Sequence, residues 1–315
     1  MRAKEVVSVK KRTLLSCVVQ DLKKYKSIYI MVIPVLAFYG LFCYKPMYGL
    51  LMGFQNYSPS AGISGSEWVG LTHFKDFIQS PDFSGLIKNT LAVSICGLVF
   101  GFPAPIIFAL LVNEIRQKKF KRVVQTFSYL PHFISLVVIC GMIKQFVSRT
   151  GVITVILSSI LGTEPSDMLT NGNLYLPIYT ISSIWQGMGW DAIIYIAALA
   201  PVNISLYEAA AIDGAKKFQQ VIHVTLPAIA PTIIMMLILR VGQLMSVGHE
   251  KTLLLYNPLI YGRADIISTY VYRLAFEGQQ WSYTTAVGLF NSVINFTLVI
   301  VVNQISRKVA DTSLW

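Results

Sequence analysis

The segment "SLYEAAAIDGAKKFQQVIHVTLP", residues 205–227, is polar and rich in alanine, although the chain around it is strongly apolar. Hydrophobic residues make up 54% of the 315-residue chain and charged residues only 13%. The segment nevertheless carries acidic and basic side chains and ends in a proline. Its role depends on where it lies relative to the apolar stretches on both sides.

The composition is typical of an α-helical membrane protein. Mean hydropathy is +0.59, and soluble domains are rarely this apolar and this poor in charge. Several apolar runs reach the length of about 20 residues that a helix needs to cross a bilayer. A soluble domain of this composition would expose large apolar patches to water. We therefore expect an all-α, polytopic membrane protein.

Hydropathy along the chain predicts six membrane spans. They are expected at residues 27–48, 87–113, 124–147, 175–200, 228–247 and 283–303. Lysine and arginine gather in segments that would share one side of the membrane: residues 1–26, 114–123, 216–217 and 304–315. Because basic residues favour the cytoplasmic side, both termini are expected there. The net charge of +11 then follows from topology and gives no support to nucleic-acid binding.

The segments outside the spans differ in character. Residues 1–26 are basic and are not followed by the small-residue cleavage site of a signal peptide, so the first span is expected to remain as an anchor. Residues 55–86, 148–174 and 248–282 are long and contain glycine, proline and aromatic residues. Loops of this length usually have a function, and we expect them to fold over the outer mouth of the helical bundle.

By this topology residues 201–227 lie in the cytoplasm, between the fourth and fifth spans. Ser205 and Glu208 have the spacing of a capping box, in which the serine caps the first turn and the glutamate reaches back to it. Ala209 and Ala210 follow, and alanine combines strong helix propensity with almost no side-chain bulk. We therefore expect a short helix with a face that another surface can approach closely.

The helix is expected to end at Gly214, because glycine fits a helix stop or a sharp bend. A second short helix over 216–226 would return the chain to the membrane, where Pro227 and Pro231 suit a helix start or a kink. These residues alone leave two interpretations open. The segment either packs on its own bundle or docks onto a partner protein.

The spacing resembles the EAA motif of ABC importer permeases. That motif reads Glu-Ala-Ala, three residues, Gly, nine residues and Ile-x-Leu-Pro, and Val224 replaces the isoleucine here. The resemblance implies a coupling helix at about 205–214 that sits in a groove of an ATP-binding subunit. Glu208 is then implied to cap the helix and to pair with a basic residue of the groove. The residues implied in coupling are Glu208, Ala209, Ala210, Asp213, Gly214, Leu226 and Pro227.

Less specific similarities cover most of the chain. The stretches 68–77, 44–57, 254–261 and 268–273 are similar to maltose-permease-like sugar importers, and the last three to their polysaccharide-type (LplB-like) branch. The resemblance implies a type I ABC importer permease fold in a bacterial cell membrane. It also implies a second homologous permease, two cytoplasmic ATP-binding subunits that hold ATP and Mg, and an extracellular sugar-binding protein.

Motifs for catalysis are missing from the sequence. It has no G-x-x-x-x-G-K-[ST] phosphate loop, no H-E-x-x-H and no G-x-S-x-G. Its cysteines (Cys17, Cys43, Cys96 and Cys140) share no C-x-x-C spacing, and its histidines are scattered. We therefore expect no catalytic residue, no metal site and no cofactor in this chain, which would serve as a pore-forming subunit.

Polar side chains inside the predicted spans mark either a substrate pathway or contacts between helices, because they are costly in lipid. The candidates are Trp185, Gln186, Trp190 and Asp191 in the fourth span, Arg240 and Gln243 in the fifth, and Asn291 and Asn295 in the sixth. Aromatic faces and amide groups suit sugar recognition. Ordinary helix packing explains the same residues, so both interpretations stay open.

Asp191 and Arg240 are expected at similar depth in the membrane. At 1.5 Å per residue, they lie about 15 Å and about 14 Å from the inner ends of their spans. Our hypothesis is that they form an ion pair between the fourth and fifth spans. The alternative is that each faces a water-filled cavity or the neighbouring subunit separately.

The sequence thus predicts a membrane domain over 27–303, flanked by cytoplasmic segments at 1–26 and 304–315. Its expected function is that of a permease subunit of an ATP-driven importer for oligosaccharides or polysaccharide fragments. An ABC importer for peptides or amino acids is an alternative, because the EAA motif is shared. A secondary transporter that works without ATPases is a more distant one.

Overall fold

The computed structural model describes residues 24–310. Most of the predicted N-terminal segment 1–26, together with Cys17, and the last part of the predicted tail 304–315 therefore lie outside the described residues. The described chain is helical apart from a two-stranded antiparallel sheet, in which Gln55 pairs with Trp68. This confirms the expected all-α class.

Five helices of the described part are long and apolar enough to cross a membrane. They are Lys26–Phe54, Phe83–Glu114, Leu136–Leu161, Lys217–Val241 and Trp281–Lys308. A further candidate is the helix Gly172–Leu199, which is followed after a bend of 78° by the helix Ile204–Ile212. The structure thus offers up to six spans, as predicted.

Several of these helices consist of joined segments. The elements that build them are α2 (Lys26–Phe38), η1 (Tyr39–Tyr44), α3 (Lys45–Met47), η2 (Tyr48–Phe54), α6 (Phe83–Cys96), η3 (Gly97–Gly101), α7 (Pro103–Glu114), α9 (Leu136–Val147), α10 (Val152–Leu161), α11 (Gly172–Leu199), α12 (Ile204–Ile212), α13 (Lys217–Gln220), η6 (Val221–Thr225), α14 (Leu226–Val241) and α18 (Trp281–Ala310). The connecting elements are β1 (Gln55–Asn56), α4 (Gly62–Gly65), β2 (Glu67–Trp68), α5 (Thr72–Gln79), α8 (Lys118–Tyr129), η4 (Leu130–Phe133), η5 (Met168–Thr170), α15 (His249–Leu255), η7 (Pro258–Ile260), α16 (Tyr261–Ala264) and α17 (Ile267–Phe276).

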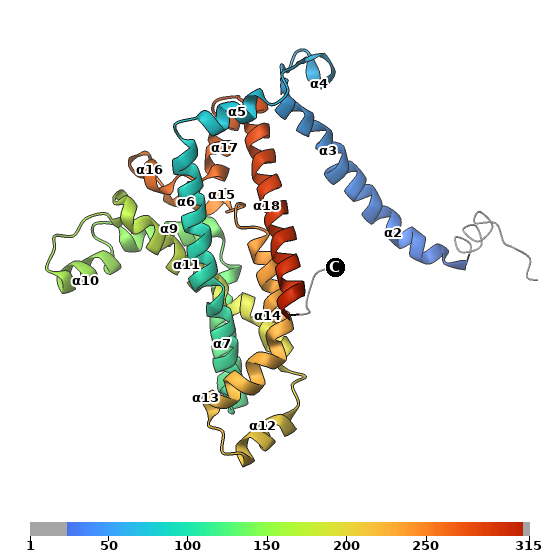
Figure 1. The fold of residues 1–315 in the computed structure, drawn as a ribbon. Coiled ribbons are helices and arrows are strands. Elements are labelled where there is room, and N and C mark those ends of the chain that lie inside the picture. Colours follow the sequence, from blue (N-terminus) through green and yellow to red (C-terminus); the bar gives the residue numbers. More distant parts are fainter. Residues whose placement is uncertain (1–23, 311–315) are drawn as a thin grey trace, which may run out of the picture.

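The first helix is longer than the predicted span 27–48, since it continues to Phe54. Pro46 does not end it, because this proline stands in the first turn of α3, where a missing N–H is tolerated. α2 runs away from the rest of the molecule, and none of its residues is buried (Figure 1).

The third predicted span, 124–147, is not one helix. α8 ends at Tyr129, a 3-10 turn that contains Pro131 follows, and Ser135 is extended before α9 begins. Proline has no N–H to donate to the helical ladder, and the chain becomes extended at Ile134, three residues after Pro131. The apolar helix of spanning length here is Leu136–Leu161, so the prediction of a continuous helix over 124–147 is wrong.

The remaining long helices pack side by side (Figure 1). α11 lies along α7, and α18 lies along α14 and η2. Ala109 of α7, Ala192 of α11 and Ile229 of α14 are buried together in one cluster. Phe77 of α5 and Val287 of α18 are buried in a second cluster. Apolar side chains from several helices thus hold the bundle together.

Two of the long segments, 55–86 and 248–282, are folded onto the bundle, as predicted. The third, 148–174, differs from the prediction, because α10 belongs to the apolar helix Leu136–Leu161 and lies away from the other long helices (Figure 1). α5 and α17 both pack on α18. Asp265 forms an ion pair with Arg273 at 2.6 Å and also accepts a hydrogen bond from the Thr269 hydroxyl at 2.6 Å. The Tyr57 N–H donates to the Ser282 hydroxyl at 2.8 Å and so joins two of these segments. The side of the membrane that they face stays a prediction.

Candidate coupling helix and membrane cavity

α12 begins at Asn203, directly after the bend that follows α11. The Asn203 side chain accepts a hydrogen bond from the Ser205 N–H at 3.0 Å and so acts as the N-cap. Ser205 already lies inside the helix, and within the described residues Glu208 makes no hydrogen bond or ion pair. The predicted Ser205–Glu208 capping box is therefore wrong. Asparagine caps a helix as well as serine does, and it stands two residues earlier.

α12 ends at Ile212, and the chain turns at Gly214, where the glycine was predicted to stop the helix. Gly214 has a φ of 79°, and its N–H donates to the Ala211 carbonyl at 3.1 Å. The Ala215 N–H donates to the Ala210 carbonyl at 2.9 Å, which completes a Schellman motif. A Cβ at Gly214 would meet no atom within 4 Å. Glycine is thus favoured here for its left-handed backbone, not for lack of space.

The surface of α12 is open. None of its residues is buried, and the helix lies at the far end of the molecule (Figure 1). Ile212 is 87% exposed and Phe218, just beyond the turn, is 74% exposed. Ala209 is exposed and Ala210 is half-buried. Large apolar side chains that stay exposed on one segment are typical of a docking site.

The chain beyond Gly214 differs from the prediction. In place of a second short helix over 216–226, one helix runs from Lys217 to Val241, so the predicted fifth span 228–247 starts and ends too late. Leu226 and Pro227 are the first residues of α14, directly after the π-helical turn η6. Proline is tolerated at such a position.

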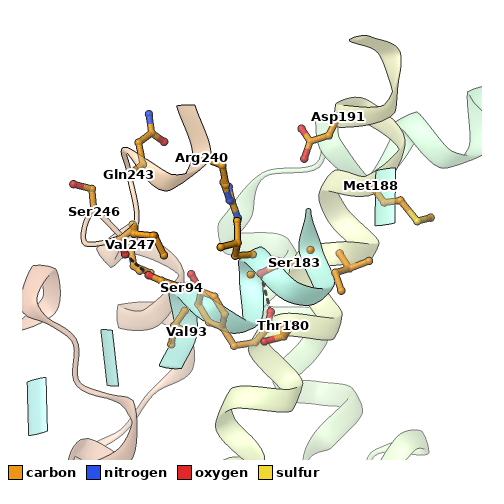
Figure 2. Close-up of a pocket in the computed structure, with 17 residues that line it drawn as sticks. Val93, Ser94, Thr180, Ser183, Met188, Asp191, Arg240, Gln243, Ser246 and Val247 are labelled. Atoms are coloured by element: carbon orange, nitrogen blue, oxygen red, sulfur yellow. Dashed lines mark hydrogen bonds between the residues drawn. The ribbon is translucent and has the colours of Figure 1, made fainter. Parts of the chain in front are cut away.

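A polar cavity of about 210 Å³ lies between η3, α11 and the end of α14 (Figure 2). Its polar lining comprises Ser94, Tyr179, Thr180, Ser183, Asp191, Arg240, Gln243 and Ser246. A second hollow of about 690 Å³ follows along α11 and is lined by Trp190, Asp191, Tyr195, Arg240 and Gln243, among others. The two hollows share Asp191, Arg240 and Gln243 and therefore meet at these side chains.

Asp191 and Arg240 reach into the same space from α11 and α14 (Figure 2). Within the described residues, however, they form no ion pair, since the pairs within 4.0 Å lie elsewhere. The estimate that both residues lie at a similar depth agrees with their place in one cavity. The predicted Asp191–Arg240 ion pair, however, is wrong for the described residues. The alternative, in which each faces the cavity separately, matches the structure.

The other predicted pathway residues lie apart from this point. Trp190 lines the second hollow and stacks on His132 with ring centroids 4.4 Å apart. Trp185 lines an apolar groove between α9, α10 and α11, and Gln186 lines neither hollow. The structure thus brings four of the eight candidates together: Trp190, Asp191, Arg240 and Gln243.

Asn291 and Asn295 lie in α18 and line neither hollow. Asn295 accepts a hydrogen bond from the Met245 N–H at 2.9 Å and donates to the Ser246 hydroxyl at 2.7 Å. Asn291 donates to the Met245 carbonyl at 2.9 Å. Both amides thus fix the turn that follows Arg240, and they position the cavity wall from behind.

The sequence analysis missed Tyr179, Ser183 and Lys251. The buried Lys251 ammonium donates to the Ser183 hydroxyl at 2.7 Å and to the Tyr179 carbonyl at 3.3 Å. Ser183 precedes Asp191 by about two helical turns, so helical periodicity could have found it. Lys251 belongs to a segment between the predicted spans, and no sequence signal places it against α11.

The chain is similar to known transport proteins over nearly its whole length. Residues 101–311 match the family described as binding-protein-dependent transport system inner membrane component. Protein LplB of Bacillus subtilis (strain 168) is 43% identical over 93% of this chain and 92% of its own length. The polygalacturonan/rhamnogalacturonan transport system permease protein YteP of the same organism is 40% identical over 92% of this chain and 90% of its own length.

A solved structure shows the same architecture. In the crystal structure of a bacterial alginate ABC transporter in complex with an alginate pentasaccharide-bound periplasmic protein, one chain matches with a TM-score of 0.86 and 41% identity. The match covers 94% of this chain and 99% of that chain. This chain therefore belongs to the family of binding-protein-dependent transport system inner membrane components.

Proposed function

We propose that this chain is one of two membrane subunits of an ATP-driven importer of oligosaccharides. The observation that carries the proposal is α12, a short exposed helix bounded by Asn203 and Gly214 at the end of the bundle. Its sequence has the spacing of a coupling helix, and the chain has no phosphate loop of its own. ATP and Mg would therefore be held by two separate ATPase subunits that dock on α12.

The saccharide class is supported by the relatives and by the chemistry of the cavity. The names of two relatives refer to polygalacturonan/rhamnogalacturonan and to alginate. Trp190 offers an aromatic face for a sugar ring, while Asp191, Arg240 and Gln243 offer groups that bond hydroxyls. We place the substrate pathway along the two hollows that meet at these side chains.

The partners follow from the exposed surfaces. A second, homologous permease would cover the unburied helix α2 and close the open side of the cavity. An extracellular sugar-binding protein would meet the folded segments around α5 and α17. The concentration of basic residues supports cytoplasmic termini in a bacterial cell membrane, with the membrane domain over 27–303.

Reconstitution in liposomes tests the proposal. The chain is assembled with the proposed second permease, ATPase and binding protein, and uptake of labelled oligosaccharides is measured. We expect uptake that requires ATP and stops when the ATPase is left out. Uptake of peptides but not saccharides would change the substrate class. Uptake driven by an ion gradient without ATPase would contradict the proposal itself.

Arg240 should be required for uptake but not for assembly. Its guanidinium lines both hollows and forms no ion pair within the described residues, so Arg240→Gln breaks no ion pair, while it removes the positive charge that faces the same cavity as Asp191. Losing one hydrogen bond from a charged group costs about 1.5–3 kcal/mol, or roughly 10- to 100-fold in kcat/KM. Radiolabelled uptake by the assembled importer measures the effect, with the exposed Arg307→Gln as control. Equal uptake by both variants would remove Arg240 from the pathway.

A further inference from the structure

We propose that the hydrogen bond between Tyr207 and Thr225 is the joint through which α12 moves α14. This inference rests on the proposed coupling role of α12. Tyr207 lies in the middle of α12, and Thr225 is the residue that directly precedes α14. Their hydroxyl oxygens are 3.0 Å apart. Within the described residues, this is the side-chain hydrogen bond that links α12 to the spanning helix that follows it.

The joint is part of a closed chain of hydrogen bonds. The Thr225 hydroxyl donates to the Gln220 carbonyl at 3.3 Å, so the Tyr207 hydroxyl is left to donate to Thr225. The Gln220 side-chain amide donates to the Ala215 carbonyl at 3.2 Å. The Ala215 N–H donates to the Ala210 carbonyl, back in α12, at 2.9 Å. The loop that connects α12 to α14 is thereby braced across its width.

Two residues of this chain of hydrogen bonds are buried, which strengthens the bonds that they make. Thr225 is 2% exposed and Gln220 is 7% exposed, whereas α12 has no buried residue. A hydrogen bond shielded from water is electrostatically stronger than one in water, and an unpaired polar group there is costly. α12 is thus exposed over most of its surface, and its side-chain contact with the helix that follows is a part-buried hydrogen bond to the buried Thr225.

The spanning helix beyond the joint leads to the cavity. α14 continues from Leu226 through Pro231 to Arg240 without a break in the helix. At 1.5 Å per residue, Arg240 lies about 22 Å along the axis from Thr225. A displacement of α12 that is transmitted at Thr225 therefore shifts the wall where the two hollows meet. Tyr207 and Thr225 are positioning residues in this scheme, since neither touches the substrate.

A second contact near the joint is weaker. Lys217 forms an ion pair with Glu114 at 3.1 Å, but the two side chains are 66% and 39% exposed. Exposed ion pairs contribute little and are screened by salt. This pair links the end of α7 to α13 and does not include α12. It offers a matched control, because breaking it disturbs the same region without opening the joint.

The experiment uses the complete importer with Tyr207→Phe and, separately, Thr225→Val. Both changes keep the shape of the side chain and remove the shared hydrogen bond. We expect uptake to fall on the order of fivefold or more, while the ATPase stays bound and still hydrolyses ATP. The number of ATP molecules consumed per sugar therefore rises. The double variant should lose no more than either single variant, because the two residues make one contact.

Control variants distinguish loss of the Tyr207–Thr225 hydrogen bond from misfolding or a nonspecific effect of changes in this region. Ser205→Ala removes a hydroxyl from the same helix, and Lys217→Ala breaks the exposed ion pair, and both should leave the ratio of ATP to sugar unchanged. Thr225→Ser keeps the hydroxyl and should transport normally even if Thr225→Val fails to insert. A normal ratio in Tyr207→Phe would overturn the joint while leaving ATP-driven uptake by the unchanged importer intact. Release of the ATPase by Tyr207→Phe would also overturn it, because the residue would then act in docking.

Discussion

Replacing Ala209 with tryptophan should stop ATP-driven uptake while the permease still inserts and binds its partner permease. Ala209 is exposed on α12. It takes no part in the Asn203 cap or in the Tyr207–Thr225 hydrogen bond, so its substitution leaves both contacts in place. If α12 docks on an ATPase as proposed, a bulky ring at this point would keep the helix away from it. Key residues of an interface are worth about 2–4 kcal/mol, which corresponds to roughly 30- to 1000-fold in ATPase affinity.

Co-purification of the ATPase with the permease pair measures this loss, and ATP-dependent uptake should fall with it. Ala209→Ser is the matched control, because serine keeps the residue small and should bind the ATPase normally. The half-buried Ala210 is a less direct test, since a large side chain there also presses on its own chain. If Ala209→Trp retained full ATPase binding, α12 would dock through another face or not at all.

The end of α12 could be predicted from sequence because it depends on local chemistry. A left-handed residue that closes a Schellman motif is nearly always glycine, and Gly214 is the glycine at the right place. The start of the helix is less determined. Asn203 and Ser205 can both cap a helix, and the choice between them depends on where the chain leaves the bend after α11. That bend is a property of the tertiary structure.

The ends of the long helices also differ in how far the local sequence determines them. Hydropathy located the fourth span closely, because α11 is one unbroken helix over Gly172–Leu199. It failed for 124–147, because a hydropathy average over many residues does not register a break of a few residues at Pro131–Ser135, even though His132 and Ser135 lie in it. It also failed at the start of the fifth span, because the polar residues after Lys217 continue the membrane helix into water.

The sequence predicted how deep the cavity residues lie along their helices, but not which way their side chains point. Counting residues placed Asp191 and Arg240 at one level, and both line the same cavity. Whether two such groups pair depends on the rotation of each helix about its axis, which hydropathy does not report. Asn295 was selected for its polarity alone, yet it bonds the backbone behind Arg240. Lys251 reaches the wall from a connecting helix, a contact that exists only in the folded chain.

Among the glycines of the described residues, Gly189 leaves the least room for a Cβ, and its substitution should cause a large loss of stability. Gly189 of α11 faces the backbone of Ser128 in α8, and a Cβ built on Gly189 would lie 2.9 Å from the Ser128 Cβ and nearer still to its carbonyl group. Small residues allow such approaches between membrane helices. Gly189→Ala must therefore push α8 away from α11, and overpacking of this kind costs about 1–3 kcal/mol or more.

Gly187→Ala provides the matched control, two residues away in the same helix. A Cβ there would meet the Asp191 carboxylate at 3.4 Å, an ordinary contact, and alanine favours a helix over glycine by about 1 kcal/mol. We expect Gly187→Ala to keep or raise the melting temperature of the detergent-solubilised permease, and Gly189→Ala to lower it and reduce the yield of folded protein. Equal melting temperatures would mean that α8 does not rest on Gly189.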